Sequence, residues 1–182
     1  MRIIAGRFRG HRLVAPPSGT RPTSDRVREA LFSSLAARTD LEGVTVLDLF
    51  AGSGALGLEA VSRGAGRLVA VDSSRGAIRV LRGNAARLGV EVEAHVQPVA
   101  TFLTRTAPVP YDLVLLDPPY DLPVDDVLEL LPHGWLAPGA TVVVERSSRS
   151  PDPVFPAALG EATGRHYGET TLWLARAPQA DD

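Results

Sequence analysis

Residues 44–57 read VTVLDLF followed by AGSGALG, and this stretch decides the fold of the chain. The first seven residues are mostly apolar, which predicts a buried strand. Gly52, Gly54 and Gly57 then satisfy the pattern G-x-G-x-x-G, which predicts a tight turn that opens a helix to about Ser62. Glycines in such a turn let the backbone come close to a ligand, so this stretch predicts a nucleoside-binding site at the end of the strand.

The next strand ends in an acid that suits the same kind of ligand. Residues 67–72 read RLVAVD, and a carboxylate at this place can accept two hydrogen bonds from a ribose. The glycines and Asp72 alone fit a dinucleotide as well as S-adenosylmethionine (SAM). Asp48 favours SAM, because a carboxylate there would repel a pyrophosphate but attract an ammonium group. We therefore expect SAM to be held by Asp48, Phe50, Ala51, Gly52, Ser53, Gly54, Asp72 and Ser73.

The rest of the chain alternates strand and helix, which is typical of the α/β class. The expected strands are continuous apolar runs, as in a parallel sheet covered by helices on both faces. We expect helices over residues 25–38, 74–88, 99–104 and 124–131, and strands over 92–97, 111–117 and 140–146. We also expect an antiparallel hairpin of residues 158–166 and 170–176 at the C-terminal end, and a small N-terminal β-hairpin of residues 2–5 and 11–14.

Composition excludes several classes of protein. A chain of 182 residues with 45% hydrophobic and 22% charged residues is expected to fold as one domain. It has no cysteine, which excludes disulfides, thiolate metal sites and cysteine nucleophiles. A chain without disulfides is also what we expect of a protein in the reducing cytoplasm. The four histidines are scattered without metal-ligand spacing, so no metal site is expected. No apolar stretch approaches a membrane span, no signal peptide is expected, and the absence of a coiled-coil pattern favours a monomer.

The net charge of −2 conceals a strong asymmetry along the chain. Residues 1–38 carry a net charge of +6, whereas the remaining residues carry −8. A basic N-terminal arm on an acidic body predicts a polyanionic partner that meets the arm first. The candidate phosphate contacts in the arm are Arg7, Arg9, Arg12 and Arg21.

A second motif indicates the chemistry. Asp117-Pro118-Pro119-Tyr120 directly follows an expected strand, at the sheet edge where open α/β folds bind ligands. An exocyclic amino group of a base is a poor nucleophile, because its lone pair is delocalised into the ring. The carboxylate of Asp117 and a backbone carbonyl held rigidly by the two prolines can accept its N–H bonds, which localises the lone pair. Tyr120 can stack on the base. These four residues are the predicted catalytic residues.

The two motifs together resemble those of Rossmann-like, SAM-dependent amino-methyltransferases. Residues 2–6 (RIIAG), 9–10 (RG) and 21–32 (RPTSDRVREALF) narrow the resemblance further. Across essentially the whole chain, the sequence resembles the bacterial 16S rRNA guanine-N2 methyltransferases of the RsmD type. The resemblance implies a seven-stranded, mostly parallel sheet of order 3-2-1-4-5-7-6. It also implies methylation of the guanine conventionally numbered 966, within a small ribosomal subunit or an assembly intermediate.

The resemblance further implies a division of the chain and two more cofactor contacts. Residues 1–22 would form a basic arm that engages the substrate, residues 23–177 the methyltransferase domain, and residues 178–182 a disordered tail. Thr23 and Arg26 would lie near the cofactor. Many SAM enzymes place Asp or Asn after the third strand to accept the adenine amino group, but this chain has Pro98 at the nearest position. Gln97, a backbone carbonyl or water would have to replace it.

Two other functions remain open from the motifs. Adenine-N6 methylation of DNA would use the same four-residue motif, although a large DNA-recognition domain is absent from these 182 residues. A non-catalytic RNA-binding assembly factor would have kept the methyltransferase fold and lost the activity. The intact glycine motif and Asp117 argue against such a loss. A nicotinamide oxidoreductase is disfavoured by Asp48.

Overall fold

The elements of the chain alternate as the apolar runs predict. The computed structural model describes residues 1–15 and 24–180. No helix in this part of the chain is both long enough and apolar enough to span a membrane. The helices are α1 (Asp25–Ala36), α2 (Ala55–Ser62), α3 (Arg75–Leu88), α4 (Val99–Leu103) and α5 (Asp125–Leu130). The strands are β1 (Thr45–Leu49), β2 (Arg67–Asp72), β3 (Glu93–Val96), β4 (Tyr111–Leu116), β5 (Leu136–Ser147), β6 (Thr163–Tyr167) and β7 (Thr170–Arg176).

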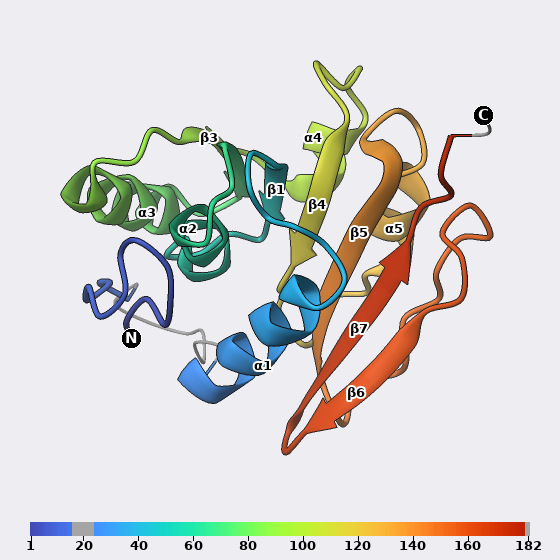
Figure 1. Ribbon diagram of the computed structural model, residues 1–182. Coiled ribbons are helices and arrows are strands. Elements are labelled where there is room, and N and C mark those ends of the chain that lie inside the picture. Colours follow the sequence, from blue (N-terminus) through green and yellow to red (C-terminus); the bar gives the residue numbers. More distant parts are fainter. Residues whose placement is uncertain (16–23, 181–182) are drawn as a thin grey trace.

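The seven strands form one sheet in the order β3-β2-β1-β4-β5-β7-β6 (Figure 1). Strands β1 to β5 pair in parallel, whereas β7 runs antiparallel to both β5 and β6. The predicted strand order and the C-terminal hairpin are thereby confirmed. This arrangement is the Rossmann-like fold of SAM-dependent methyltransferases.

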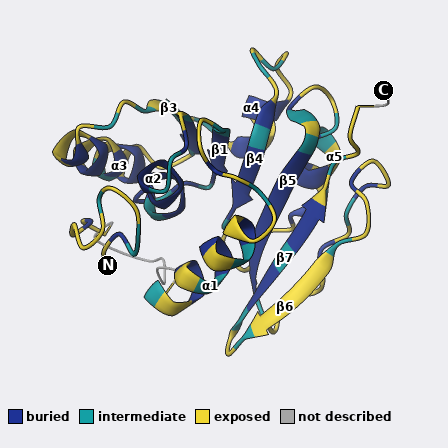
Figure 2. Cartoon of the chain, viewed as in Figure 1, coloured by how far each residue is buried: buried dark blue, intermediate teal, exposed yellow. Residues whose placement is uncertain are grey.

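The central strands are covered on both faces, which explains their continuous apolar runs. One face packs Val46, Leu113 and Leu115 against α1 and α2. The opposite face packs Leu47 and Leu49, together with alternate residues of the neighbouring strands, against α4 and α5. Figure 1 shows α1 in front of the sheet and α4 and α5 behind it, and Figure 2 shows burial concentrated in the central strands. The outer strand β6 is exposed, so the hydrophobic core lies under the strands that carry the two motifs.

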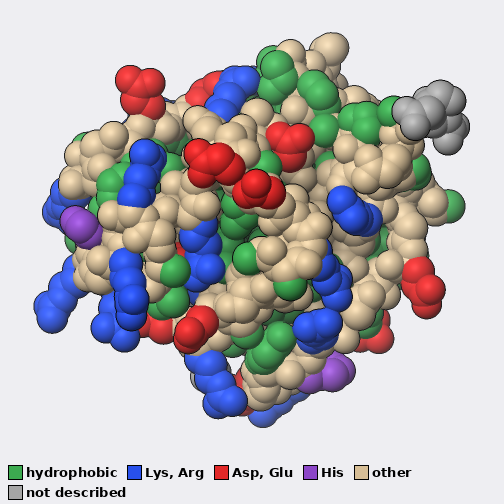
Figure 3. All heavy atoms as spheres, viewed as in Figure 1, with side chains coloured by type: hydrophobic (Ala, Val, Ile, Leu, Met, Phe, Trp, Pro, Cys, Tyr) green, Lys and Arg blue, Asp and Glu red, His purple; other side chains and the backbone are tan. Residues whose placement is uncertain are grey.

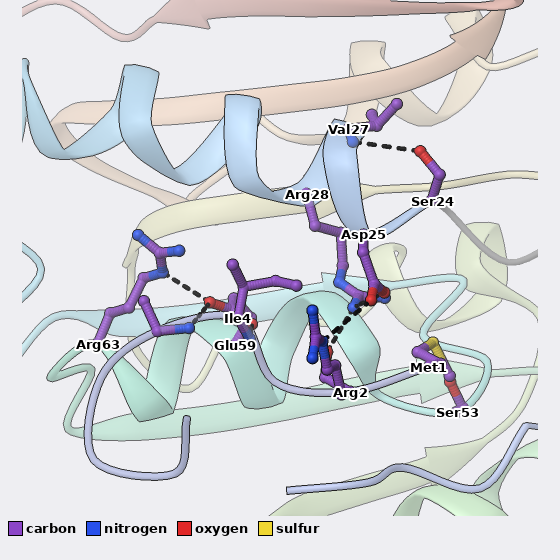
Figure 4. A network of polar contacts seen from close by, with 11 residues as sticks. Met1, Arg2, Ile4, Ser24, Asp25, Val27, Arg28, Ser53, Glu59 and Arg63 are labelled. Atoms are coloured by element: carbon purple, nitrogen blue, oxygen red, sulfur yellow. Dashed lines mark hydrogen bonds and ion pairs between the residues drawn. The ribbon is translucent and has the colours of Figure 1, made fainter. Parts of the chain in front are cut away.

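The first turn of α1 contains a buried charged residue. Ser24 caps the helix, because its side chain accepts a hydrogen bond from Val27 N at 3.2 Å. Arg28 is fully buried, with 0% exposure. Its Nη2 donates to Arg2 O at 2.5 Å and to the Asp25 carboxylate at 2.7 Å. Arg28 thus ties the start of the arm to α1 (Figure 4).

The arm is held by a buried carboxylate on α2. Glu59 has 0% exposure, and its side chain accepts hydrogen bonds from Ile4 N at 2.8 Å and Ala5 N at 3.1 Å. Arg63 Nε donates to the same carboxylate at 2.8 Å, which balances its charge (Figure 4). One turn later, the carbonyl of Ser62 accepts Arg7 N at 2.8 Å. The arm therefore follows α2 with its backbone bonded to the helix.

Both expected hairpins contain strands that are shorter than the sequence suggested. The N-terminal hairpin contains a single antiparallel bridge, between Arg2 and Arg12, supported by the bond from Ile3 N to His11 O at 3.0 Å. The expected strand of residues 158–166 begins only at Thr163. Leu159 instead forms a turn onto Pro156 O and is buried in the core, which removes the preceding residues from the sheet.

Candidate active site

Three loops meet at the carboxyl edge of the sheet. Asp48 of β1 pairs in register with Ala70 of β2 and with Leu115 of β4, so these three strands end together. The loop after β1 is residues 50–54, β2 ends at Asp72, and the loop after β4 begins at Asp117. The two sequence motifs therefore lie side by side, which is where open α/β sheets bind ligands.

The loop after β1 has a tightly specified backbone. Phe50, Gly52 and Gly54 all adopt positive φ angles, of 62°, 55° and 81°. The left-handed conformation costs a residue other than glycine about 1–2 kcal/mol, so contacts around Phe50 must hold it there. A Cβ placed on Gly52 would meet only Phe50 O, at 4.0 Å, so the loop backbone is open on that side. A ligand can approach the backbone closely at this point.

Asp72 joins this loop to the start of α3 through its two oxygens. Its Oδ2 accepts Gly52 N at 2.9 Å and its Oδ1 accepts Ser74 N at 2.8 Å. Ser74 in turn caps α3 by accepting Ala77 N at 3.2 Å. A carboxylate has about four acceptor positions, so Asp72 keeps acceptor capacity for hydroxyl groups of a ligand. Ser73 is exposed next to it, at the same edge.

Asp48 lies beneath the loop rather than on its surface. The residue is 1% exposed, and its Oδ2 accepts Gly57 N at 3.0 Å. A Cβ on Gly57 would come within 2.8 Å of that oxygen, so only glycine allows this contact. Burial raises the pKa of Asp48 to about 8; the bond from Gly57 lowers it, and the charges of Asp117 and Asp72 raise it further. A cation beside Asp48 would favour its ionised form.

The loop after β4 presents an acid, a rigid turn and an aromatic ring. Asp117 N donates to Leu49 O at 3.5 Å, which joins this loop to the end of β1. Asp117 is partly buried and Pro118 is buried, whereas Tyr120 is 45% exposed. The carbonyl of Pro118 accepts no hydrogen bond from the described part of the chain. An acceptor pair and an exposed aromatic side chain thus share one loop.

Gln97 carries a donor without a partner. Its backbone N donates to Asp72 O at 3.1 Å, which places it at the same edge of the sheet. Its Oε1 accepts Arg105 Nη2 at 2.6 Å, and because a guanidinium can only donate, this contact fixes the orientation of the amide. Its Nε2 is buried without a hydrogen-bond partner. Gln97 therefore offers a donor, which suits a ring nitrogen, rather than the acceptor expected for an adenine amino group.

The other predicted site residues are spread more widely. Thr23 and Arg21 lie outside the described residues. Arg26 is exposed on the first turn of α1, and no described contact joins it to the loop after β1. Arg7, Arg9 and Arg12 are exposed on the arm, and Figure 3 shows cationic side chains gathered over this part of the molecule.

Two buried polar residues near the site had no functional role in the sequence interpretation. Asn84 is 1% exposed, and its side chain bonds to both backbone groups of Val14 at 2.9 Å and to Ser53 O at 3.0 Å. It links the arm to the loop after β1, and Met1 Sδ also lies 4.0 Å from Ser53 Oγ (Figure 4). Arg146 is 5% exposed and reaches the loop after β4. The only signal for Arg146 in the sequence is a cation at the end of an apolar strand.

The donor set fits SAM. Asp72 suits the ribose, the open backbone at Gly52 suits close approach, and the unpartnered Nε2 of Gln97 suits the adenine ring. Among residues 1–15 and 24–180, no three His, Asp or Glu side chains come together as metal ligands would. The fold and the site define the class: a Rossmann-like methyltransferase that uses SAM.

The family described as "Conserved hypothetical protein 95" matches residues 1–176, and the chain belongs to this family. It is 39% identical to "Ribosomal RNA small subunit methyltransferase D" of Escherichia coli over 160 residues, which are 86% of this chain and 80% of the relative. The protein of the same name in Haemophilus influenzae is 36% identical over 158 residues, 83% of this chain and 81% of the relative.

Solved structures agree with these relatives. A hypothetical protein of Thermus thermophilus superposes with a TM-score of 0.81 at 36% identity, covering 96% of this chain and 98% of that chain. The Thermus thermophilus 16S rRNA N2 G1207 methyltransferase, solved with AdoMet and guanosine, superposes with a TM-score of 0.69. At 21% identity, covering 86% of this chain and 44% of that chain, it supports the fold alone.

Replacing Asp72 with alanine should weaken SAM binding. The change removes an ionised acceptor, which is worth about 1.5–3 kcal/mol, or roughly a tenfold to hundredfold change in Kd. It also frees the amides of Gly52 and Ser74. Calorimetry with SAM, its demethylated product and NAD measures the effect. Glu91→Ala, at an exposed position before β3, should bind SAM as the unmodified chain does. Tighter binding of NAD than of SAM would overturn the assignment.

Asp48 should make the stability of the folded chain depend on pH. The pKa of Asp48 in the folded chain, about 8, lies above the ordinary value of 3.8. Between these two pH values the folded chain therefore holds a proton that the unfolded chain has lost. The free energy of unfolding should therefore fall as pH rises from about 4 to about 8. Asp48→Asn cannot ionise, so the variant should gain stability over the unmodified chain as pH rises through this window.

Thermal or urea unfolding at several pH values measures this difference. Asp152→Asn changes an exposed carboxylate and should follow the unmodified chain at every pH. If Asp48→Asn shows the same pH dependence as the unmodified chain, Asp48 does not hold the proton.

Proposed function

We propose that this chain transfers a methyl group from SAM to the exocyclic N2 amino group of a guanine in small-subunit (16S) rRNA. By resemblance, the target is the guanine conventionally numbered 966. The observation that carries the proposal is the loop after β4, where the Asp117 carboxylate, the Pro118 carbonyl and the exposed ring of Tyr120 adjoin the SAM-type loop of residues 50–54.

Each of these groups has a separate task in the proposed reaction. The Asp117 carboxylate and the Pro118 carbonyl accept the two N–H bonds of the amino group, which localises its lone pair on nitrogen. Tyr120 stacks on the base and holds it outside its helix. SAM, when bound, supplies an electrophilic methyl group on a sulfonium. Positioning of the two reactants can lower the activation barrier by roughly 7–11 kcal/mol. Asp117 therefore need only orient the amino group. The proton of the methylated amino group can leave to solvent afterwards.

The names of the relatives and the charge of the arm support rRNA as the substrate. The curated relatives of Escherichia coli and Haemophilus influenzae are named as small-subunit rRNA methyltransferases. Residues 1–38 carry the net positive charge that an acidic body needs in order to approach RNA. We propose that residues 1–22 engage the RNA and that residues 23–177 carry out the reaction. The proposed enzyme acts as a cytoplasmic monomer on a small subunit or an assembly intermediate.

The direct test is a methyl-transfer assay with labelled SAM and three substrates. These are small ribosomal subunits that lack the modification, protein-free small-subunit rRNA, and DNA that contains adenine. Mass analysis of the nucleosides should find N2-methylguanosine and locate it at one position of the rRNA. N6-methyladenine in the DNA would favour the DNA methyltransferase, and no transfer to any substrate would favour an assembly factor.

Substitutions at Asp117 and Tyr120 should separate chemistry from cofactor binding. Asp117→Ala should remove most methyl transfer and leave SAM affinity and folding nearly unchanged, because the carboxylate faces the amino group. Tyr120→Phe should be mild because stacking survives, whereas Tyr120→Ala should lose about 1–3 kcal/mol of base stacking. Single-turnover rates and SAM calorimetry provide the two readouts. An Asp117→Ala variant with activity within a few-fold of the unmodified chain would contradict the mechanism.

Neutralising three arm arginines should weaken RNA binding without affecting SAM. Their side chains are exposed while the backbone around them is bonded to α2, so glutamine at Arg7, Arg9 and Arg12 should keep the arm in place. The slope of log affinity against log salt should fall by about 0.7–0.9 for each phosphate that the arm no longer neutralises. A matched control replaces three exposed arginines on or near the β6–β7 hairpin: Arg149, Arg165 and Arg176. Equal slopes in both triple variants would mean that the arm does not grip phosphates.

A further inference from the structure

Strand β5 extends beyond its neighbour, beneath the loop that follows β4. Leu116, the last residue of β4, pairs in register with Val144, and β5 continues for three residues to Ser147. Arg146 thus lies two residues beyond the last pair, where β4 has already turned away into the loop of residues 117–122. On its other side, Arg146 pairs with Thr171 of β7, which fixes the backbone of this extension.

The guanidinium of Arg146 donates to three backbone carbonyls of that loop. Nη1 donates to Pro119 O at 3.2 Å and to Leu122 O at 3.1 Å, and Nη2 donates to Tyr120 O at 3.1 Å. The loop is itself closed by a bond from Leu122 N to Pro119 O at 3.0 Å. One planar cation therefore sets the directions of three of the carbonyls in a four-residue turn.

Holding this cation in the protein is costly. Arg146 is 5% exposed, and burial lowers its pKa, while the nearby carboxylates of Asp125, Asp117 and Asp121 oppose that shift. An apolar side chain of similar volume would fill such a place at lower cost in free energy. What an apolar side chain could not do is orient carbonyl groups. The geometry therefore gives Arg146 a role beyond packing.

The carbonyls that bind Arg146 lie next to one carbonyl of the same loop that does not, that of Pro118. Pro119, Tyr120 and Leu122 point their oxygens at the guanidinium, whereas the oxygen of Pro118 accepts no hydrogen bond within the described part of the chain. Asp117, directly before it, is attached through its N–H to the end of β1. The Pro118 carbonyl thus lies between two anchored points of the loop.

We propose that Arg146 is a positioning residue for methyl transfer, which holds the loop of residues 117–122 so that the Pro118 carbonyl and the Asp117 carboxylate face the substrate amino group. It does not touch the substrate, and it acts through the turn that carries Tyr120. The inference rests on the proposed function, since it assigns the two acceptors to an amino group. A residue that only stabilised the fold would affect SAM binding and methyl transfer alike, whereas a positioning residue affects the rate of transfer.

The test compares Arg146→Lys and Arg146→Ala with Arg149→Ala, a change of an exposed arginine three residues further along whose side chain pairs with Glu169. An ammonium group cannot donate to three carbonyls in the fixed directions of a guanidinium, so Arg146→Lys keeps the charge and loses the clamp. In both Arg146 variants kcat should fall by roughly tenfold to a hundredfold, with SAM Kd within about twofold. Arg149→Ala should match the unmodified chain.

Chemical rescue separates positioning from folding. Millimolar methylguanidine should restore part of the kcat of Arg146→Ala, because it can reoccupy the site, and methylammonium should not. Rescue without a change in SAM Kd supports the proposal. Equal losses of kcat and SAM affinity, or an unchanged kcat in Arg146→Lys, would overturn it.

A second readout does not depend on the substrate. Amide hydrogen exchange at Leu122, whose N–H bonds to Pro119 O, should accelerate in Arg146→Lys while amides of the central strand β4 keep their protection. If the unmodified chain methylates no rRNA, the proposed function fails, and faster exchange at Leu122 still shows whether Arg146 holds the loop. Unchanged exchange at Leu122 would overturn the positioning role whatever the substrate.

Discussion

The hydrogen bond from Gly52 N to the Asp72 carboxylate joins two strand ends that the rest of the site is built around. This bond holds the loop after β1 at the end of β2. The other oxygen of Asp72 accepts Ser74 N and so fixes the start of α3. Phe50 then takes a left-handed conformation, which costs a residue other than glycine about 1–2 kcal/mol. Because Asp48 bonds to Gly57 from below, the loop is held from two sides and its outer surface stays open.

Carboxylates from three strands converge at this edge, which makes it suited to a cation and to amino groups. Asp48 and Asp72 accept backbone amides in and next to the loop after β1. Asp117 is the first residue of the loop after β4. The guanidinium of Arg146 lies near one of these three acids, Asp117, and its hydrogen bonds go to neutral carbonyls. The site thus separates two tasks: Asp48 and Asp72 accept backbone amides around the loop after β1, and a buried cation sets the shape of the loop after β4.

Local sequence patterns predicted the sheet well and the buried charges poorly. Strand β2 has the predicted bounds, because apolar runs and glycine turns are local signals. The strand order, which the resemblance implied, was also confirmed. Arg28, Glu59 and Arg146 were not predicted as buried, because each is neutralised or bonded by residues far along the chain; Glu59 receives Ile4 N across 55 positions. Helical periodicity cannot reveal such partners. The donor character of Gln97 likewise depends on Arg105, eight residues away.

The hydrogen bonds between the arm and Glu59 affect how the arm can associate with another molecule. Ile4, Ala5 and Arg7 already have their amides bonded to α2, and Val14 is bonded to Asn84 of α3. The conformational entropy of this backbone is therefore lost during folding and not during association. Residues 4–14, ordered in advance, keep more of their contact energy as affinity than a segment that must fold on its partner. Their arginines meet a partner as parts of a rigid surface.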